Sequence, residues 1–331
     1  MLDIRNNNFD LIRLVLAVLV GFAHWNFLTN LNNESIIFDF SKIAVDGFFI
    51  ISGFLIFWSY DNNNNTLYFY IKRFFRIFPL YAILIILQTL VFILISDENI
   101  IQVIKYFFVN IIFLNFLSPS VGNTFDSLAI NAINGSLWTL KNEVFFYLLV
   151  PIFYLLYKKF GMIFWYFLYF SSIIYLFVFN YLGYEKLLIQ FPGQLRLFVM
   201  GILLYVLFSK LSSKSLIVLM PLSLILLIIF KDSNIFQFIF YPIFLGLVVF
   251  FFIYAFYKIK IKFDFSYSFY IIHFPIIQLF MYFKINPENP FISFLLIFSI
   301  VFVLSFISEK YVEKGFIKVG RNLINRIKQR A

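Results

Sequence analysis

Long apolar stretches separated by short polar segments make up most of this 331-residue chain, and they predict membrane-spanning helices. An α-helix needs about 20 predominantly apolar residues to cross the hydrocarbon core of a bilayer. Ten stretches reach or approach that length, at about residues 9–29, 43–60, 78–96, 143–157, 161–181, 193–209, 215–230, 238–257, 266–284 and 291–308. An eleventh stretch, 103–117, is short and contains Lys105 and Asn110, which is typical of a re-entrant or interfacial segment. The pattern predicts an all-α, polytopic integral membrane protein with about ten transmembrane helices.

The distribution of lysine and arginine predicts how these spans are oriented. With ten spans and a cytoplasmic N-terminus, most of the 26 basic residues fall on the cytoplasmic side. An additional crossing at 103–117 would leave fewer than half of them there, so the positive-inside rule favours ten spans with both termini cytoplasmic. We expect a single transmembrane domain over residues 1–314 and a basic cytoplasmic tail over 315–331 that could lie on the membrane surface.

Composition narrows the chemistry that the chain can carry. Hydrophobic residues make up 63% of the sequence, charged residues only 13%, and the mean hydropathy is +0.93. The absence of cysteine excludes disulfides and thiolate nucleophiles, and two histidines among scattered carboxylates give no reason to expect a metal. The net charge of +10 follows the loops, so we interpret it as a determinant of topology facing membrane lipid and expect no nucleic-acid partner. We expect a multi-pass protein of the inner (plasma) membrane whose first apolar stretch is a span rather than a cleaved signal peptide.

An arginine and a histidine share one face of the first predicted span. Arg13 and His24 are eleven residues apart, which is almost three full helical turns and about 16 Å along the axis. Ionisable groups within a membrane are costly and indicate a functional site.

Two carboxylates fall near the outer side, close to the predicted level of His24. Asp46 begins the second span and Glu143 begins the fourth, so both could orient the imidazole or stabilise its charged form in an acid–base site. Alternatively, Asp46 pairs with Lys42 one turn earlier, and Glu143 merely favours a helix N-terminus.

A basic cluster marks the cytoplasmic entry to the third span. Arg73 and Arg76 lie three residues apart, beside Lys72, and two guanidinium groups on one side of a helix suit phosphate. Basic residues at an inner helix end are alternatively ordinary membrane anchors. His273 lies in the middle of the ninth span, either as a functional group or as a buried side chain satisfied by a neighbour.

Taken in order, these segments resemble the acyltransferase-3 family of integral membrane O-acyltransferases. The segments that carry the resemblance are 9–13 with His24, 46–56, 73–81, 136–151, 196–201, 266–275 and 311–314. They run in the family's order over residues 9–314. One departure is Gly315, at a place where the family usually has proline. The sequence contains none of the SGNH-type hydrolase domain that is fused to some relatives, so we expect a stand-alone enzyme.

The resemblance implies transfer of an acyl group, most often acetyl, from cytoplasmic acyl-CoA to a hydroxyl of a cell-envelope or exported polysaccharide. His24, Asp46 and Glu143 are then expected to be catalytic, with His24 as general base or transient acyl carrier. Arg13, Lys72, Arg73 and Arg76 are expected to bind acetyl-CoA. The motif residues Trp138, Arg196, Tyr267 and His273 are expected to bind the acceptor.

A second hypothesis is a proton-coupled transporter or flippase of lipid-linked sugars, in which the same ionisable groups form a proton relay. The sequence leaves open the acceptor, the choice among short acyl groups, an acyl-histidine intermediate against direct transfer, and the oligomeric state, a homo-oligomer included.

Overall fold

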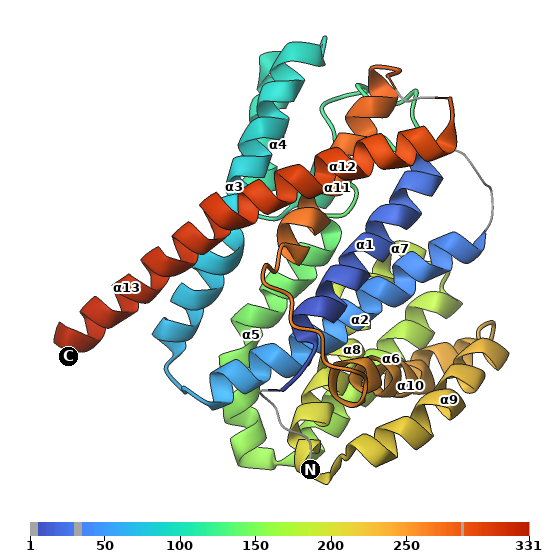
Figure 1. Ribbon diagram of the computed structural model, residues 1–331, viewed down its shortest axis with the longest axis vertical. Helices are drawn as coiled ribbons and strands as arrows, with labels where there is room; N and C mark the ends of the chain where they lie inside the picture. Colours follow the sequence, from blue (N-terminus) through green and yellow to red (C-terminus); the bar gives the residue numbers. More distant parts are fainter. Residues whose placement is uncertain (1–5, 30–34, 286–287, 331) are drawn as a thin grey trace. The chain divides into compact units, whose positions relative to one another are not determined.

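The computed structural model describes residues 6–29, 35–285 and 288–330, with the backbone alone described for 35–39. Arg5, which we assign to the cytoplasmic side, and Ala331, at the end of the predicted tail, lie outside the described residues. Helices connected by loops make up the whole of the described chain, which contains no strand (Figure 1). The α-helices are α1 (Phe9–Leu28), α2 (Ser35–Asp61), α3 (Thr66–Ile95), α4 (Ile100–Ile111), α5 (Trp138–Phe160), α6 (Met162–Tyr181), α7 (Glu185–Leu188), α8 (Phe191–Val206), α9 (Ser213–Ile229), α10 (Tyr241–Phe250), α11 (Ser266–Tyr282), α12 (Pro290–Ser308) and α13 (Lys314–Arg330).

The polytopic all-α class predicted from the sequence is confirmed. Within the described residues, 8 helices are long and apolar enough to cross a membrane, and each overlaps one of the predicted spans. The other two predicted spans coincide with α9 and α11, which have 17 residues each, at the lower limit of length for a transmembrane helix. The orientation of the termini stays a prediction.

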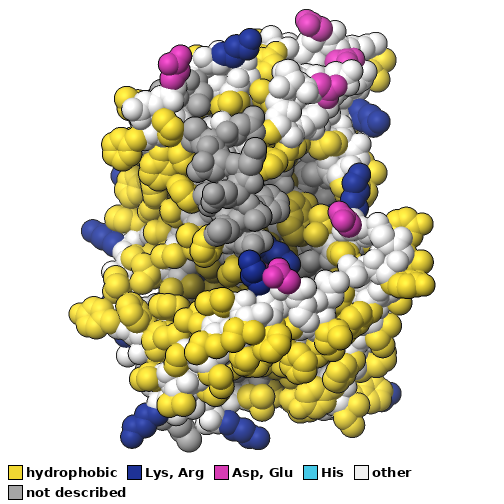
Figure 2. Space-filling model, turned by 90° about the vertical axis from the view of Figure 1, so that its right-hand side faces the viewer, with side chains coloured by type: hydrophobic (Ala, Val, Ile, Leu, Met, Phe, Trp, Pro, Cys, Tyr) yellow, Lys and Arg dark blue, Asp and Glu magenta, His cyan; other side chains and the backbone are white. Residues whose placement is uncertain are grey.

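Large apolar side chains are exposed over much of the molecule. Leu94 is 82% exposed and Ile163 is 76% exposed, and hydrophobic side chains cover wide areas of the face shown in Figure 2. In water so much exposed apolar surface would drive aggregation, whereas hydrocarbon tails cover it at no such cost.

The segment predicted to be re-entrant or interfacial forms the 12-residue helix α4, which at 1.5 Å per residue is about 18 Å long. A buried polar network holds it. The Tyr81 hydroxyl donates to the Asn110 carbonyl at 2.5 Å, the Asn110 amide donates to the Ser118 carbonyl at 2.8 Å, and the Tyr106 hydroxyl donates to Gln88 at 2.8 Å. Beside this network lies an apolar cluster that includes Phe92, Val103, Tyr106, Phe125 and Ile133. The helix and the loop after it are therefore packed parts of the fold.

The described residues form two compact units. The first takes its residues from 1–16, 43–69 and 142–261, and the second from 17–42, 70–141 and 262–331. Four helices, α1, α2, α3 and α5, each contribute residues to both units, so neither unit is a continuous segment of sequence.

Two glycines let α2 and α8 pack backbone to backbone in the first unit. A Cβ on Gly201 would overlap the carbonyl oxygen of Ile50, and a Cβ on Gly53 would overlap that of Phe198. Small residues commonly bring membrane helices this close, because van der Waals packing replaces the hydrophobic effect as the driving force in lipid.

Gly201→Ala should therefore destabilise the fold. The new methyl group forces α2 and α8 apart, and overpacking of this kind costs about 1–3 kcal/mol. The apparent melting temperature in detergent, followed by tryptophan fluorescence, measures the effect. Gly315→Ala is the matched control, since a Cβ there meets nothing within 4 Å. Equal melting temperatures for the two variants would contradict the prediction.

The predicted basic tail is a helix. A π-helical turn, Glu309–Glu313, joins α12 to α13, so helical structure is continuous over Pro290–Arg330, the long red helix of Figure 1. Within α13 only Gly320 and Ile324 are buried, one turn apart, which is the pattern of an amphipathic helix that packs along one stripe.

Candidate active site

The two histidines of the chain form a hydrogen-bonded pair in the second unit. His24 lies on α1 and His273 on α11, and His24 Nδ1 is 2.8 Å from His273 Nε2. Their ring planes differ by 6°, so the hydrogen bond lies close to the plane of both imidazoles.

A glycine one turn before His24 permits this approach. A Cβ on Gly21 would come within 2.8 Å of the Phe269 ring and 3.6 Å of His273 Cγ. Gly21 and His24 are three residues apart and therefore share a face of α1. The missing side chain at 21 is what lets the helices pack closely enough for the imidazoles to meet.

The hydrogen bonds of the pair define the tautomer of each ring. His273 Nδ1 lies 3.2 Å from the carbonyl oxygen of Phe269, and because a carbonyl only accepts, this nitrogen carries the proton. In a neutral His273, Nε2 is then an acceptor, so the proton between the rings belongs to His24 Nδ1. His24 Nε2 is left as a basic lone pair.

The two imidazole rings differ in solvent exposure. His273 is 1% exposed, whereas His24 is half-buried. Among the described residues no hydrogen bond is made to His24 Nε2, while its other nitrogen is held by His273. The geometry therefore presents one fixed imidazole with one available basic nitrogen.

A polar segment before α5 packs against α11 beside the pair. The Asn134 amide donates to the Ile271 carbonyl at 2.9 Å, and the Thr139 and Tyr270 hydroxyls are 2.8 Å apart. A Cβ on Gly135 would lie 2.7 Å from the Phe274 ring, which itself stands edge-on to His24 with centroids 5.1 Å apart. The loop thus closes over the helix that carries His273.

The predicted catalytic carboxylates belong to the first unit. Glu143 accepts hydrogen bonds from the Ser52 hydroxyl, at 3.2 Å, and from the Tyr147 hydroxyl. Asp46 is buried and interacts electrostatically with Arg196 of α8, which is also buried. Their convergence on His24 stays a prediction.

Arg196 has unused donors. Its Nε and Nη1 make no hydrogen bond among the described residues, although the side chain is only 5% exposed. Buried guanidinium nitrogens are nearly always satisfied, so unsatisfied ones point to a missing partner.

The predicted spacing of Arg13 and His24 rests on one uninterrupted helix, and α1 is such a helix over all twenty of its residues. Arg13 is half-buried near its beginning.

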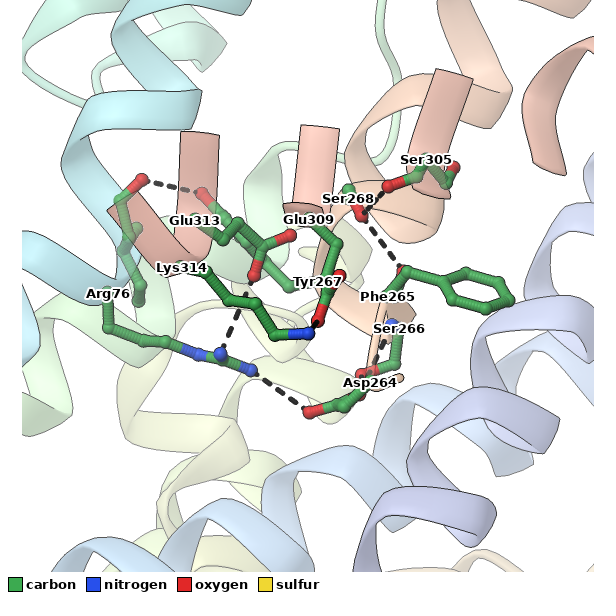
Figure 3. Close-up of polar contacts among 11 residues, drawn as sticks. Arg76, Asp264, Phe265, Ser266, Tyr267, Ser268, Ser305, Glu309, Glu313 and Lys314 are labelled. Atoms are coloured by element: carbon green, nitrogen blue, oxygen red, sulfur yellow. Dashed lines mark hydrogen bonds and ion pairs between the residues drawn. The ribbon is translucent and has the colours of Figure 1, made fainter. Parts of the chain in front are cut away.

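Arg76 of α3 is held by two carboxylates of the second unit (Figure 3). Its Nη2 is 3.2 Å from Asp264 and its Nη1 is 3.5 Å from Glu313, whose side chain is 1% exposed. Next to it, the Tyr267 hydroxyl donates to the Ile77 carbonyl at 2.9 Å. Arg76 and Tyr267 therefore join α3 to α11 and to the turn before α13.

Arg76→Gln should lower the stability of the protein. Removing one partner of a largely buried ion pair leaves the other charge uncompensated, at a cost of about 3 kcal/mol. Because 1 kcal/mol corresponds to about 2–4 °C in a chain of this order of size, the apparent melting temperature should fall by about 5 °C or more. The double variant with Glu313→Gln should recover part of the loss. Additive losses in the double variant would argue against the pair.

The other predicted donor-binding residues precede Arg76 on α3. Lys72 is exposed and Arg73 is half-buried, and the two interact electrostatically. Trp138, the first residue of α5, is half-buried.

Comparison with known proteins identifies the architecture that carries these groups. The family model described as an acyltransferase domain, of the acyltransferase-3 type, matches residues 6–310. The chain belongs to the acyltransferase-3 family. The resemblance predicted from the ordered motifs is thus confirmed, and the acyltransferase domain holds both histidines, all three predicted catalytic residues and the ion-paired Arg76.

A curated relative of this acyltransferase-3 protein is Nodulation protein 10 of Rhizobium leguminosarum bv. viciae. It is 33% identical over 160 residues, which is 44% of this chain and 44% of that protein. The match therefore spans less than half of the relative's length. No solved structure is significantly similar to the chain.

Sequence reasoning about this acyltransferase-3 chain missed the contact between its histidines. It left His273 as either an acceptor-binding residue or a buried side chain satisfied by a neighbour, and the structure shows that the neighbour is His24. The available signals were Gly21, one turn before His24, and the presence of just two histidines, both inside predicted spans. The ion pairs of Arg76 carried no such signal, since Asp264 and Glu313 are distant from it in sequence.

Proposed function

We propose that this protein transfers an acyl group, acetyl in the first instance, from acyl-CoA to a hydroxyl of a cell-envelope or exported polysaccharide. The observation that carries the proposal is the His24–His273 hydrogen bond, which leaves His24 Nε2 as an available base within an acyltransferase domain. Membership of the family favours acyl transfer over the transporter alternative.

In the proposed reaction, His24 Nε2 takes the proton of the acceptor hydroxyl as its oxygen attacks the thioester carbonyl. The new C–O bond forms, the C–S bond breaks, and the imidazolium returns the proton to the departing sulfur, which leaves as the free thiol of CoA. His273 accepts the hydrogen bond from His24 Nδ1 throughout and keeps the ring in place. The same lone pair could instead carry the acyl group between donor and acceptor.

The donor is proposed to enter from the cytoplasmic side of the plasma membrane. Lys72 and Arg73 lie one turn of α3 before Arg76, and the residue after Arg76 is bonded to Tyr267. From Tyr267 to His273 is six residues of α11, or about 9 Å. Phosphates held at the basic residues would leave the pantetheine arm directed along α11 toward the imidazoles.

Arg196 and Trp138 are proposed to bind the acceptor. Arg196, with two unsatisfied buried nitrogens beside Asp46, is suited to bind sugar hydroxyls or a carboxylate of the glycan. Asp46 and Glu143, both of the first unit, are proposed to be catalytic.

The test is release of free CoA by purified protein given acetyl-CoA and candidate glycans. The chain has no cysteine, so a thiol-reactive dye reports CoA without background from the protein. We expect acceptor-dependent thiol release together with labelled glycan, and loss of one acyl substituent from surface glycans in a deletion strain examined by mass spectrometry. Glycans that are identical in parent and deletion strain, together with no thiol release on any of them, would contradict the proposed function.

A further inference from the structure

The C-terminal helix packs closely on the N-terminal part of α3, within the second unit. A Cβ on Gly320 of α13 would come within 2.9–3.0 Å of the Phe75 side chain. Gly320 and Ile324 are the buried residues of α13, so the stripe that contains them faces the neighbouring protein surface.

Cationic side chains from both helices gather at this contact. Arg321 follows Gly320 directly, and Lys328 lies one turn after Ile324 and two turns after Arg321, so both are near the buried stripe. Lys72 lies three residues before Phe75 on α3. It interacts electrostatically with Arg73, Arg321 and Lys328. Three cations from the two helices thus lie within electrostatic range of Lys72.

Three acidic residues of the second unit are ion-paired with Arg76 and Lys314. Asp264 and Glu313 are the partners of Arg76, and Glu309 lies 2.7 Å from Lys314 Nζ (Figure 3). Like charges held together repel one another, and that repulsion is relieved when a multiply charged anion binds between them. Guanidinium and ammonium groups are the side chains that bind phosphate most strongly.

We propose that Arg321 and Lys328 of α13 join Lys72 and Arg73 of α3 to form one phosphate-binding site. Its ligand is a phosphate ester at the membrane surface, and we expect the phosphates of acyl-CoA to supply it. That choice of ligand rests on the proposed function. The helix itself begins at Lys314, after the family match ends at residue 310, so Arg321 and Lys328 lie outside the matched residues.

The matched charges of α13 allow a sharp test. Arg321→Gln with Lys328→Gln removes two charges that lie beside the stripe facing α3. Arg326→Gln with Arg330→Gln removes two charges from the same helix. These positions are about 140–200° around the helix axis from Arg321 and Lys328. Each variant of the full chain is placed in nanodiscs of uncharged phosphatidylcholine, and the Kd for CoA is measured by calorimetry.

The first double variant should weaken CoA binding at least about tenfold, which corresponds to about 1.4 kcal/mol, and the second should stay within about twofold. Gly320→Leu keeps every charge but displaces α13 from Phe75, and it should weaken binding as the first double variant does. Because all four charge-neutralised positions are exposed, the melting temperatures of both double variants should match that of the unmodified protein.

A second arm separates the two sources of phosphate. Binding of phosphatidylglycerol is measured in nanodiscs without CoA. A selective loss of lipid binding in the first double variant, with CoA binding unchanged, would support the phosphate site and identify a lipid headgroup as its ligand. Equal behaviour of the two double variants toward both ligands would overturn the site. If the phosphate site is overturned but the unmodified protein releases CoA, the proposed acyl transfer still stands. If acyl transfer fails but lipid binding depends on Arg321 and Lys328, the phosphate site still stands.

Discussion

Replacement of His24 by Asn is expected to lower kcat for acyl transfer by about 10²–10⁴-fold, the usual contribution of a general base. The reason is local. His24 Nδ1 is occupied by His273, so Nε2 is the nitrogen that can take the proton of the acceptor hydroxyl. Asparagine retains a hydrogen-bonding group near the Nδ1 position but has nothing at the position of Nε2.

The measurement is acceptor-dependent thiol release at saturating acetyl-CoA, with the Kd for CoA determined separately. The Kd should stay within about threefold of the unmodified value, because the phosphates are proposed to bind at Lys72 and Arg73 and not at the imidazole; a tenfold change would require about 1.4 kcal/mol. Added imidazole should restore part of the rate in His24→Gly. An unchanged kcat in His24→Asn at an unchanged melting temperature would reject His24 as the base.

Replacement of His273 by Leu is expected to lower kcat about 10–100-fold, the usual effect of removing the group that orients a catalytic or ligating histidine. Leucine fills the buried site but cannot accept the proton of His24 Nδ1, so the ring loses its fixed tautomer and orientation. His273→Gln is the conservative control. Its amide oxygen can take the position of the lost Nε2 and should restore most of the rate with KM little changed.

The tautomers themselves can be observed. Two histidines give four ring-nitrogen resonances in protein labelled with ¹⁵N-histidine and purified without a histidine tag. We expect a protonated Nδ1 and an unprotonated Nε2 on each ring, and a mixture of tautomers for His24 in His273→Leu. A protonated His24 Nε2 in the unmodified protein would contradict the assignment, and so would equal rates for the Leu and Gln variants.

Most of the helical architecture could be predicted from the sequence. In hydrocarbon a backbone must satisfy its own hydrogen bonds, so a long apolar stretch has to be helical whatever its neighbours are. Eight predicted spans are helices of sufficient length, and the interrupted stretch at 103–117 forms the short helix α4. What hydropathy could not predict was the continuation of the last span through a π-helical turn into α13, since residues 314–330 are polar.

The sequence singled out the residues of the candidate site but did not predict which of them contact one another. Charges and imidazoles within apolar stretches stand out in sequence because their burial in lipid is costly. Which groups meet depends on how helices pack, and Gly21 illustrates the limit, because its effect depends on Phe269 lying opposite.

The sequence by itself determined that this chain is a helical membrane protein of the acyltransferase-3 family, and it predicted functional positions at His24 and Arg73. Both conclusions follow from local properties, namely hydropathy and the order of short motifs. Only the tertiary structure decided that His24 is held by His273, 249 residues away, and that Arg76 pairs with Asp264 and Glu313. Contacts between such distant residues arise from packing among helices, and the polarity of each separate helix does not specify them.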